Sequence, residues 1–215
     1  MTGAVSGLAT FVEDRASGRF KDFVVTPVRR TSLMLGYLAS TFAIAFALTL
    51  IVLVAGQLFM LTQGETTMNV AEFATAIGYA ALSCLAFSAL ASFVVTFIRS
   101  NGAYSAFATI IGTAVGFLAG AYITPGIMPE GVQRVLAALP FMHAAQLIRE
   151  PYTAGALEAV TGGQPQAIEA LSEMYGLTSS VGDLTITSGI AIGSLAILAI
   201  VFTILGGWRL TRTIR

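Results

Sequence analysis

The sequence predicts an all-α, polytopic membrane protein with four transmembrane helices and short amphipathic interfacial helices, folded as one transmembrane domain over residues 1–215. Of these residues, 56% are hydrophobic and only 10% are charged, whereas a soluble domain carries about 25% charged residues. Four runs without a charged side chain are long enough to cross a bilayer, which takes roughly 20 apolar residues. They must be helical, because isolated strands would leave backbone groups unpaired in lipid. The predicted spans are residues 33–61, 73–98, 103–124 and 186–208.

The amino-terminal stub, residues 1–12, is apolar but too short to cross a bilayer. It does not have the pattern of a signal peptide, because the charged residues that begin at Glu13 follow the apolar stretch instead of preceding it. We therefore expect the stub to be the end of a longer segment.

The basic residues predict how the spans are oriented, since cytoplasmic connections are enriched in Lys and Arg. The segment 13–32 is basic, the connection 62–72 is acidic, and the turn between the second and third spans carries Arg99. The long connection 125–185 has more acidic than basic residues, and the tail is basic again. We expect both termini to be cytoplasmic and 125–185 to be an extracytoplasmic helical connection of a protein in the cell membrane.

Three glycines of the third predicted span, Gly112, Gly116 and Gly120, form a doubled GxxxG pattern. Glycines four residues apart fall on one helix face and let a neighbouring backbone approach closely. This pattern predicts tight helix packing, either within the chain or in a dimer contact.

Periodic apolar positions predict helices inside the long connection. Residues 132–139 repeat at i, i+3, i+4 and i+7, which is typical of one apolar helical face. A second short helix is expected over 141–149, ending before Pro151. A third is expected over 166–175, capped by Gly176. The first two are suited to the membrane interface.

Several kinds of chemistry are excluded by composition. The chain has one cysteine, Cys84, and one histidine, His143, so it can form neither an internal disulfide nor a metal cluster of these residues. Lys21 is its only lysine, and no phosphate-binding loop precedes it. Because the predicted spans carry no charged side chain, a proton-coupled carrier or an intramembrane enzyme is disfavoured.

The charged segment before the first span is the most informative part of the sequence. Phe20 and Phe23 share one face of a short amphipathic helix, and Thr26 can cap a new helix with Pro27 in its first turn. The pattern therefore indicates a short helix followed by a sharp restart into the membrane. A basic interfacial helix held on anionic lipid has the same composition and remains an alternative.

This segment resembles the cytoplasmic segment between the second and third spans of ABC-2 type transporter permeases. The likeness rests on the acidic pair at Glu13, on Gly18, on Thr26-Pro27 and on Arg30. The basic turn at Arg99 and the proline-bounded amphipathic stretch before the last span are similar too. Permeases of this family normally have six spans, so the resemblance implies that an interfacial first helix and nearly two spans are missing.

The resemblance implies that the segment is a coupling helix, which docks on a separate ATP-binding-cassette ATPase subunit. That subunit would bind ATP and Mg, while this chain would have no cofactor and no enzymatic activity. It would pair with a second permease half, as a homodimer or heterodimer, export an amphipathic substrate such as a drug, antibiotic, lipid or glycolipid, and bind no nucleic acid. The implied contact and hinge positions are Glu13, Arg15, Gly18, Phe20, Thr26, Pro27 and Arg30.

Two other functions remain open from the sequence. A membrane scaffold or assembly protein could use the glycine-faced helices for partner contacts without transporting anything. A secondary carrier is disfavoured by the uncharged spans. Co-purification with an ATPase subunit separates the permease from both.

Overall fold

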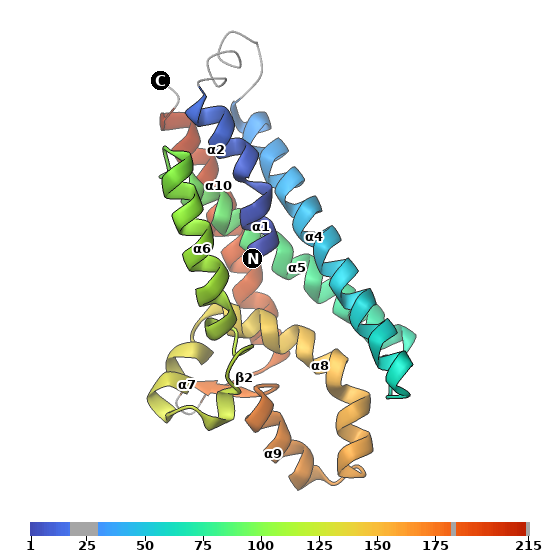
Figure 1. Cartoon of the computed structure of the whole chain (residues 1–215). Coiled ribbons are helices and arrows are strands. Elements are labelled where there is room, and N and C mark those ends of the chain that lie inside the picture. Colours follow the sequence, from blue (N-terminus) through green and yellow to red (C-terminus); the bar gives the residue numbers. More distant parts are fainter. Residues whose placement is uncertain (18–29, 182–183, 214–215) are drawn as a thin grey trace. The chain divides into compact units, whose positions relative to one another are not determined.

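The computed structural model describes residues 1–17, 30–181 and 184–213 (Figure 1). Within them, four helices are long and apolar enough to cross a membrane, which confirms the prediction of an all-α polytopic membrane protein. They are α4 (Arg30–Gln63), α5 (Val70–Val95), α6 (Asn101–Leu118) and α10 (Ser188–Thr213). The shorter elements are α1 (Thr2–Gly7), α2 (Ala9–Ala16), η1 (Pro125–Ile127), α7 (Glu130–Ala137), α8 (Pro140–Thr161), α9 (Pro165–Tyr175), β1 (Ser179–Val181) and β2 (Leu184–Ile186).

The chain divides into two compact units, and each of the four long helices contributes to both. The first unit contains α1 and α2, and the second contains the long connection between α6 and α10. The first unit comprises Met1–Thr49, Ser83–Thr113 and Ala196–Arg215. The second comprises Leu50–Leu82 and Ala114–Leu195.

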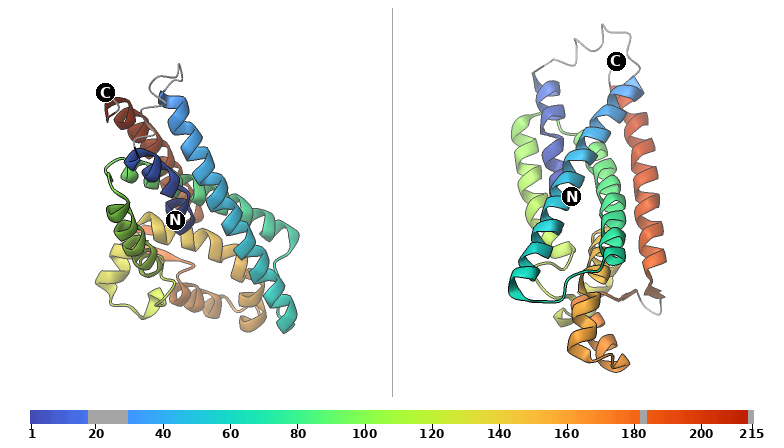
Figure 2. Two further views of the ribbon diagram at one scale, coloured as in Figure 1. Left: turned by 45° about the horizontal axis from the view of Figure 1, so that its top comes forward. Right: turned by 90° about the vertical axis from the view of Figure 1, so that its right-hand side faces the viewer.

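The amino-terminal stub forms part of the core of the first unit. Leu8 and Val12 are almost fully buried, and they cluster with Ala45 of α4 and with Val95 of α5. The hydroxyl of Tyr104 in α6 donates a hydrogen bond to the Val5 carbonyl. Figure 2 shows α1 and α2 beside α4. Burial of this apolar surface explains why a segment too short to span a membrane is nevertheless helical.

A glycine pair brings α1 into close contact with α4. A Cβ atom added to Gly3 would lie 3.2 Å from the Cα of Ala45, and one added to Gly7 would lie 3.1 Å from the Cα of Thr41. Gly3 and Gly7 are four residues apart on α1, and Thr41 and Ala45 are four residues apart on α4. The two helices therefore present matching small surfaces to one another. This GxxxG pair was not singled out in the sequence, because the stub was too short to be considered a packing helix.

The third span ends earlier than its apolar run suggests. α6 stops at Leu118, not at Thr124, because Gly120 has a positive φ of 62° and ends the helix. The Ala121 N–H donates to the Gly116 carbonyl at 2.8 Å, which is the bond of a Schellman cap that spans more residues. Gly120 is therefore a cap residue and lies outside the helix face on which the sequence placed it.

The other two glycines of that pattern lie in α6 but have different neighbours. A Cβ atom on Gly116 would meet the ring of Tyr122, in the turn that follows the same helix. A Cβ atom on Gly112 would lie 3.6 Å from the side chain of Thr2 in α1. Gly116 thus accommodates a local turn, and Gly112 lies against the stub.

The second span begins with a reciprocal cap that its sequence contains but that was not predicted. Asn69 Oδ1 accepts a hydrogen bond from the Glu72 N–H at 2.9 Å, and Glu72 Oε2 accepts one from the Asn69 N–H at 2.8 Å. These bonds satisfy two amide groups that the first turn of a helix leaves without partners. The cap explains why α5 begins at Val70, before the uncharged run starts.

In the long connection, the end of α9 agrees with the prediction from the sequence, whereas the end of α8 does not. α9 ends at Tyr175 and is capped by Gly176, which has a φ of 66°, as predicted. The expectation that a helix ends before Pro151 is wrong, because α8 continues through it to Thr161. Pro151 has no N–H for the carbonyl four residues earlier. Its ring is buried, and this packing offsets the missing bond.

A short antiparallel hairpin of β1 and β2 precedes α10 and was not predicted. Its register pairs Ser179 with Ile186 and Val181 with Leu184. The hairpin leads the chain from α9 into the last span.

Candidate functional site

The segment 13–30 is the first candidate site, and the structure describes its two ends. Glu13 is exposed near the end of α2, Arg15 lies in the same helix, and Arg30 is the first residue of α4. The other predicted contact and hinge positions lie outside the described residues; they are Gly18, Phe20, Thr26 and Pro27.

A direct contact joins the two helices that flank this segment. The hydroxyl of Tyr37 in α4 donates a hydrogen bond to Asp14 Oδ2 at 2.9 Å. The ring of Phe11 packs edge-to-face on the ring of Tyr37, with centroids 5.0 Å apart, a geometry that aromatic pairs favour. The end of α2 and the first turns of α4 are thereby held together, and we call residues 13–30, which these two ends bound, the anchored segment.

Tyr37 is a functional candidate that the sequence analysis missed. It lies within the first apolar run, where a tyrosine is easily taken for an interfacial residue. The acidic residue at position 14 was noted only for its place in the charged segment. Their sequence separation of 23 residues hides the pair until the two helices are packed.

The second candidate site is a set of polar side chains on α8. Arg149 Nη2 donates to the carbonyls of Ala119 at 2.9 Å and Gly120 at 2.6 Å, where α6 ends. Its Nη1 lies 3.3 Å from the carbonyl of Tyr175, at the end of α9. Burial lowers the pKa of the guanidinium from its ordinary value, but an arginine stays charged in proteins. A partly buried cation therefore lies at the carboxyl ends of two helices, where the helix dipole is negative.

Three more α8 residues contact the chain around the start of α10. His143 Nδ1 lies 2.6 Å from Ser194 Oγ, and its Nε2 donates to the Ala137 carbonyl at 2.8 Å. Gln146 Nε2 donates to the Ile186 carbonyl at 2.9 Å. Glu150 Oε2 accepts from the Ser188 hydroxyl at 2.7 Å. We call His143, Gln146, Arg149 and Glu150 the α8 network. His143 therefore links the end of α7 to α10.

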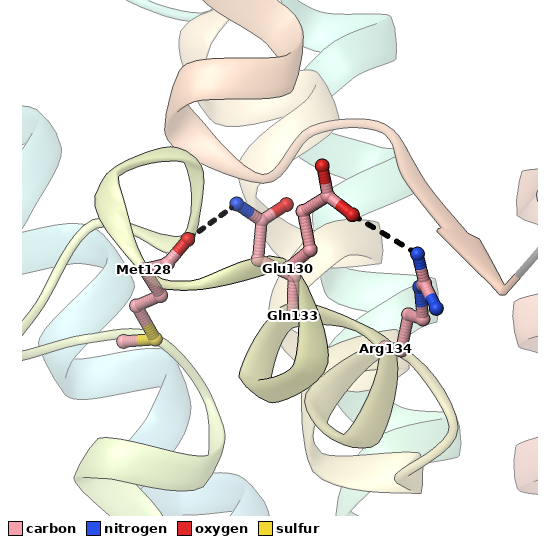
Figure 3. Close-up of polar contacts among 4 residues, drawn as sticks. All are labelled: Met128, Glu130, Gln133 and Arg134. Carbon is pink, nitrogen blue, oxygen red and sulfur yellow. Dashed lines mark hydrogen bonds and ion pairs between the residues drawn. The ribbon is translucent and has the colours of Figure 1, made fainter.

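An acidic cleft of about 1110 Å³ lies between α7, α9 and the hairpin. Glu130, Glu169 and Glu173 line it, and Glu130 pairs with Arg134 at 3.0 Å (Figure 3). This pair is exposed, so it contributes little to stability. The described part of the chain contains no group of three His, Cys, Asp or Glu residues that could hold a metal ion.

Charged side chains in the four candidate spans lie at the span ends. Glu72 is in the first turn of α5, where it completes the cap. Arg209 is the last residue of the α10 span, and its guanidinium carbon lies 3.6 Å from the centroid of the Phe97 ring. This cation–π contact holds a charge at the end of the span instead of at its centre. The interior of the described spans is thus uncharged, as the sequence predicted.

A comparison with protein-family models identifies the chain. The model for the ABC-2 family transporter protein matches residues 1–208. No curated protein matches the sequence significantly. The matched region includes the anchored segment, the long connection, the first three spans and the α10 span up to residue 208. The chain therefore belongs to the ABC-2 transporter family and is a multi-pass membrane permease of an ABC transporter.

Proposed function

We propose that this chain is the permease subunit of an ATP-driven exporter and that a separate ATPase subunit docks on the segment 13–30. The observation that supports this most is the family match, combined with the Asp14–Tyr37 contact that anchors the segment. The partner would bind ATP and Mg, and a second permease half would complete the transporter. Export further requires that the segment face the cytoplasm.

The anchoring suggests how a push from the ATPase would reach the membrane. A displacement of the segment would act on α2 and α4 together, because Tyr37 joins them beside the segment. α1 would follow, since Gly3 and Gly7 bring it against the backbone of α4. Such rigid-body movement of packed helices is a common form of conformational switching.

The chemistry of the spans favours an amphipathic substrate. No charged side chain lies at depth in the described spans, so a strongly charged substrate would have no partner there. α6 presents an exposed row of hydroxyls at Ser105, Thr109 and Thr113. Two of them donate to carbonyls one turn earlier, as Thr109 does to Ser105 at 2.9 Å. We propose that this face lines the route, because it offers weak polar contacts beside apolar ones.

Co-purification from the native membrane tests the proposal. The tagged chain is expected to bring down an ATP-binding subunit, and a Phe20→Ala variant is expected to recover about tenfold less of it, because truncating an aromatic anchor often has an effect of this size. Tyr175→Ala is the control, since it removes an exposed aromatic ring from α9, far along the chain from the segment. Two differently tagged copies would show whether the second half is another copy of this chain.

The outcomes separate the functions. Recovery of the ATPase with the chain and the control, but not with Phe20→Ala, supports the exporter. A correctly inserted chain that recovers no ATPase would reject it and favour a membrane scaffold.

A further inference from the structure

We propose that α8 is a strap that holds the end of α6 and the start of α10 together, so that these two spans move as one body at that side of the membrane. The residues that carry the proposal all lie within the second compact unit. Within the α8 network, Arg149 contacts the end of α6. The other three residues contact α10 or the residues just before it.

The attachment to α6 depends on Arg149. Its guanidinium donates to the carbonyls of Ala119 and Gly120, which the helix end leaves without amide partners. Hydrogen bonds to a charged group are stronger than neutral ones. The same side chain reaches the Tyr175 carbonyl, so one residue fixes the ends of α6 and α9 to α8.

The attachment to α10 uses the preceding turns of α8 and the residue that follows Arg149. His143 contacts Ser194, which lies within α10, and Ser194 also donates to the Ala191 carbonyl at 2.8 Å. Gln146 bonds to Ile186, just before α10, and Glu150 accepts from Ser188 at its first residue. The start of the last span is thus held at three points.

The stretch of α8 that carries these attachments, from His143 to Glu150, is suited to transmit movement. His143, Gln146 and Glu150 are spaced so that they fall on one helix face. Met142 and Leu147, which neighbour His143 and Gln146 along the helix, are almost completely buried. All of these residues precede Pro151, where the helix loses a backbone hydrogen bond. The strap is therefore the continuous, packed part of α8.

Amide hydrogen exchange on the purified full chain in lipid nanodiscs, without nucleotide, tests the strap. An Arg149→Met variant is expected to raise exchange about tenfold at Gly120 and Ala121, whose amides close the end of α6. It is also expected to raise exchange about threefold at Ala191 in α10, which Arg149 does not contact. Arg149→Lys keeps the charge and serves as the milder variant.

Reciprocal substitution makes the test independent of any single variant. Ser194→Ala removes the hydroxyl that faces His143 and is expected to raise exchange at Gly120 and Ala121, because coupling between two sites acts in both directions. Arg134→Met is the matched control, since Arg134 is an exposed arginine whose described partner is Glu130 one turn away.

The pattern of exchange decides the result. The strap predicts that Arg149→Met and Ser194→Ala each loosen both span ends, while Arg134→Met loosens neither. If Arg149→Met and Arg149→Lys affect only the ends of α6 and α9, and Ser194→Ala affects only α10, the attachments are local caps and the strap is wrong. Because no nucleotide or substrate is present, this outcome does not depend on the proposed export function.

Discussion

A Gly7→Leu substitution is expected to lower the free energy of unfolding of the first compact unit by about 3 kcal/mol, at the upper end of the usual range for overpacking. A Cβ atom at this position would lie 3.1 Å from the Cα of Thr41, which belongs to the backbone of α4 and cannot rotate away. α1 would have to move off α4, and the buried cluster around Leu8 would open. The midpoint of thermal unfolding in detergent measures the effect.

Gly36→Leu is the matched control for this prediction. Gly36 also lies in a helix, but a Cβ atom there would have no heavy atom within 4 Å. The same glycine-to-leucine change should therefore leave the unfolding midpoint unchanged or raise it slightly, because glycine is a poor helix former. Equal losses in the two variants would show that α1 does not pack on α4 through Gly7.

A Gly126→Ala substitution is expected to separate η1 from α9. A Cβ atom on Gly126 would lie 2.5 Å from the Cα and 2.9 Å from the carbonyl oxygen of Met174, so one of the two backbones must shift. We expect a loss of about 2 kcal/mol in the stability of this packing. Faster amide exchange around Gly176, at the end of α9, would report this loss. The N–H of Gly176 is hydrogen-bonded within the cap of α9, so its exchange rate depends on that cap staying intact.

Gly131→Ala provides the comparison. Gly131 lies in α7, and a Cβ atom there would meet no heavy atom within 4 Å. Alanine should stabilise the helix by up to about 1 kcal/mol. A similar rise in exchange around Gly176 in both variants would mean that Gly126 has no special role in seating α9.

The membrane spans could be predicted from the sequence because the bilayer imposes a length and a polarity that each apolar run reveals directly. The ends of the spans depend on local chemistry that hydropathy does not measure. Asn69 and Glu72 start α5 by capping it, and Gly120 ends α6 by adopting a positive φ. Both signals are present in the sequence, but they require reading individual residues as caps instead of as members of an apolar run.

The α8 network could not be predicted, because it depends on contacts between residues far apart in the chain. Arg149 donates to a carbonyl 30 residues away, and His143 faces a hydroxyl 51 residues away. A lone histidine and an arginine in a polar connection carry no pattern that indicates such partners. The continuation of α8 through Pro151 was hidden for the same reason, since its burial comes from the tertiary fold.

The packing of α1 could not be predicted from the length of the stub, because a helix too short to cross a membrane can still pack on another helix. The stub cannot cross a membrane, yet Gly3 and Gly7 have the spacing that brings helices together. In the candidate coupling segment, the sequence supplied Glu13 and its neighbours through resemblance, while the Asp14–Tyr37 contact came only with the fold. Family likeness therefore pointed to the candidate segment, and the packing of α2 on α4 shows how its described ends are held together.

Accessibility labelling in intact cells tests the central claim, that the anchored segment faces the cytoplasm. Cys84, which is buried, is first replaced by serine, and single cysteines are then placed at Ser17 and at Gln164, both exposed. A maleimide that cannot cross the membrane should label the Gln164→Cys variant in intact cells and the Ser17→Cys variant only after permeabilisation. Labelling of Ser17→Cys in intact cells, with Gln164→Cys protected, would contradict the exporter.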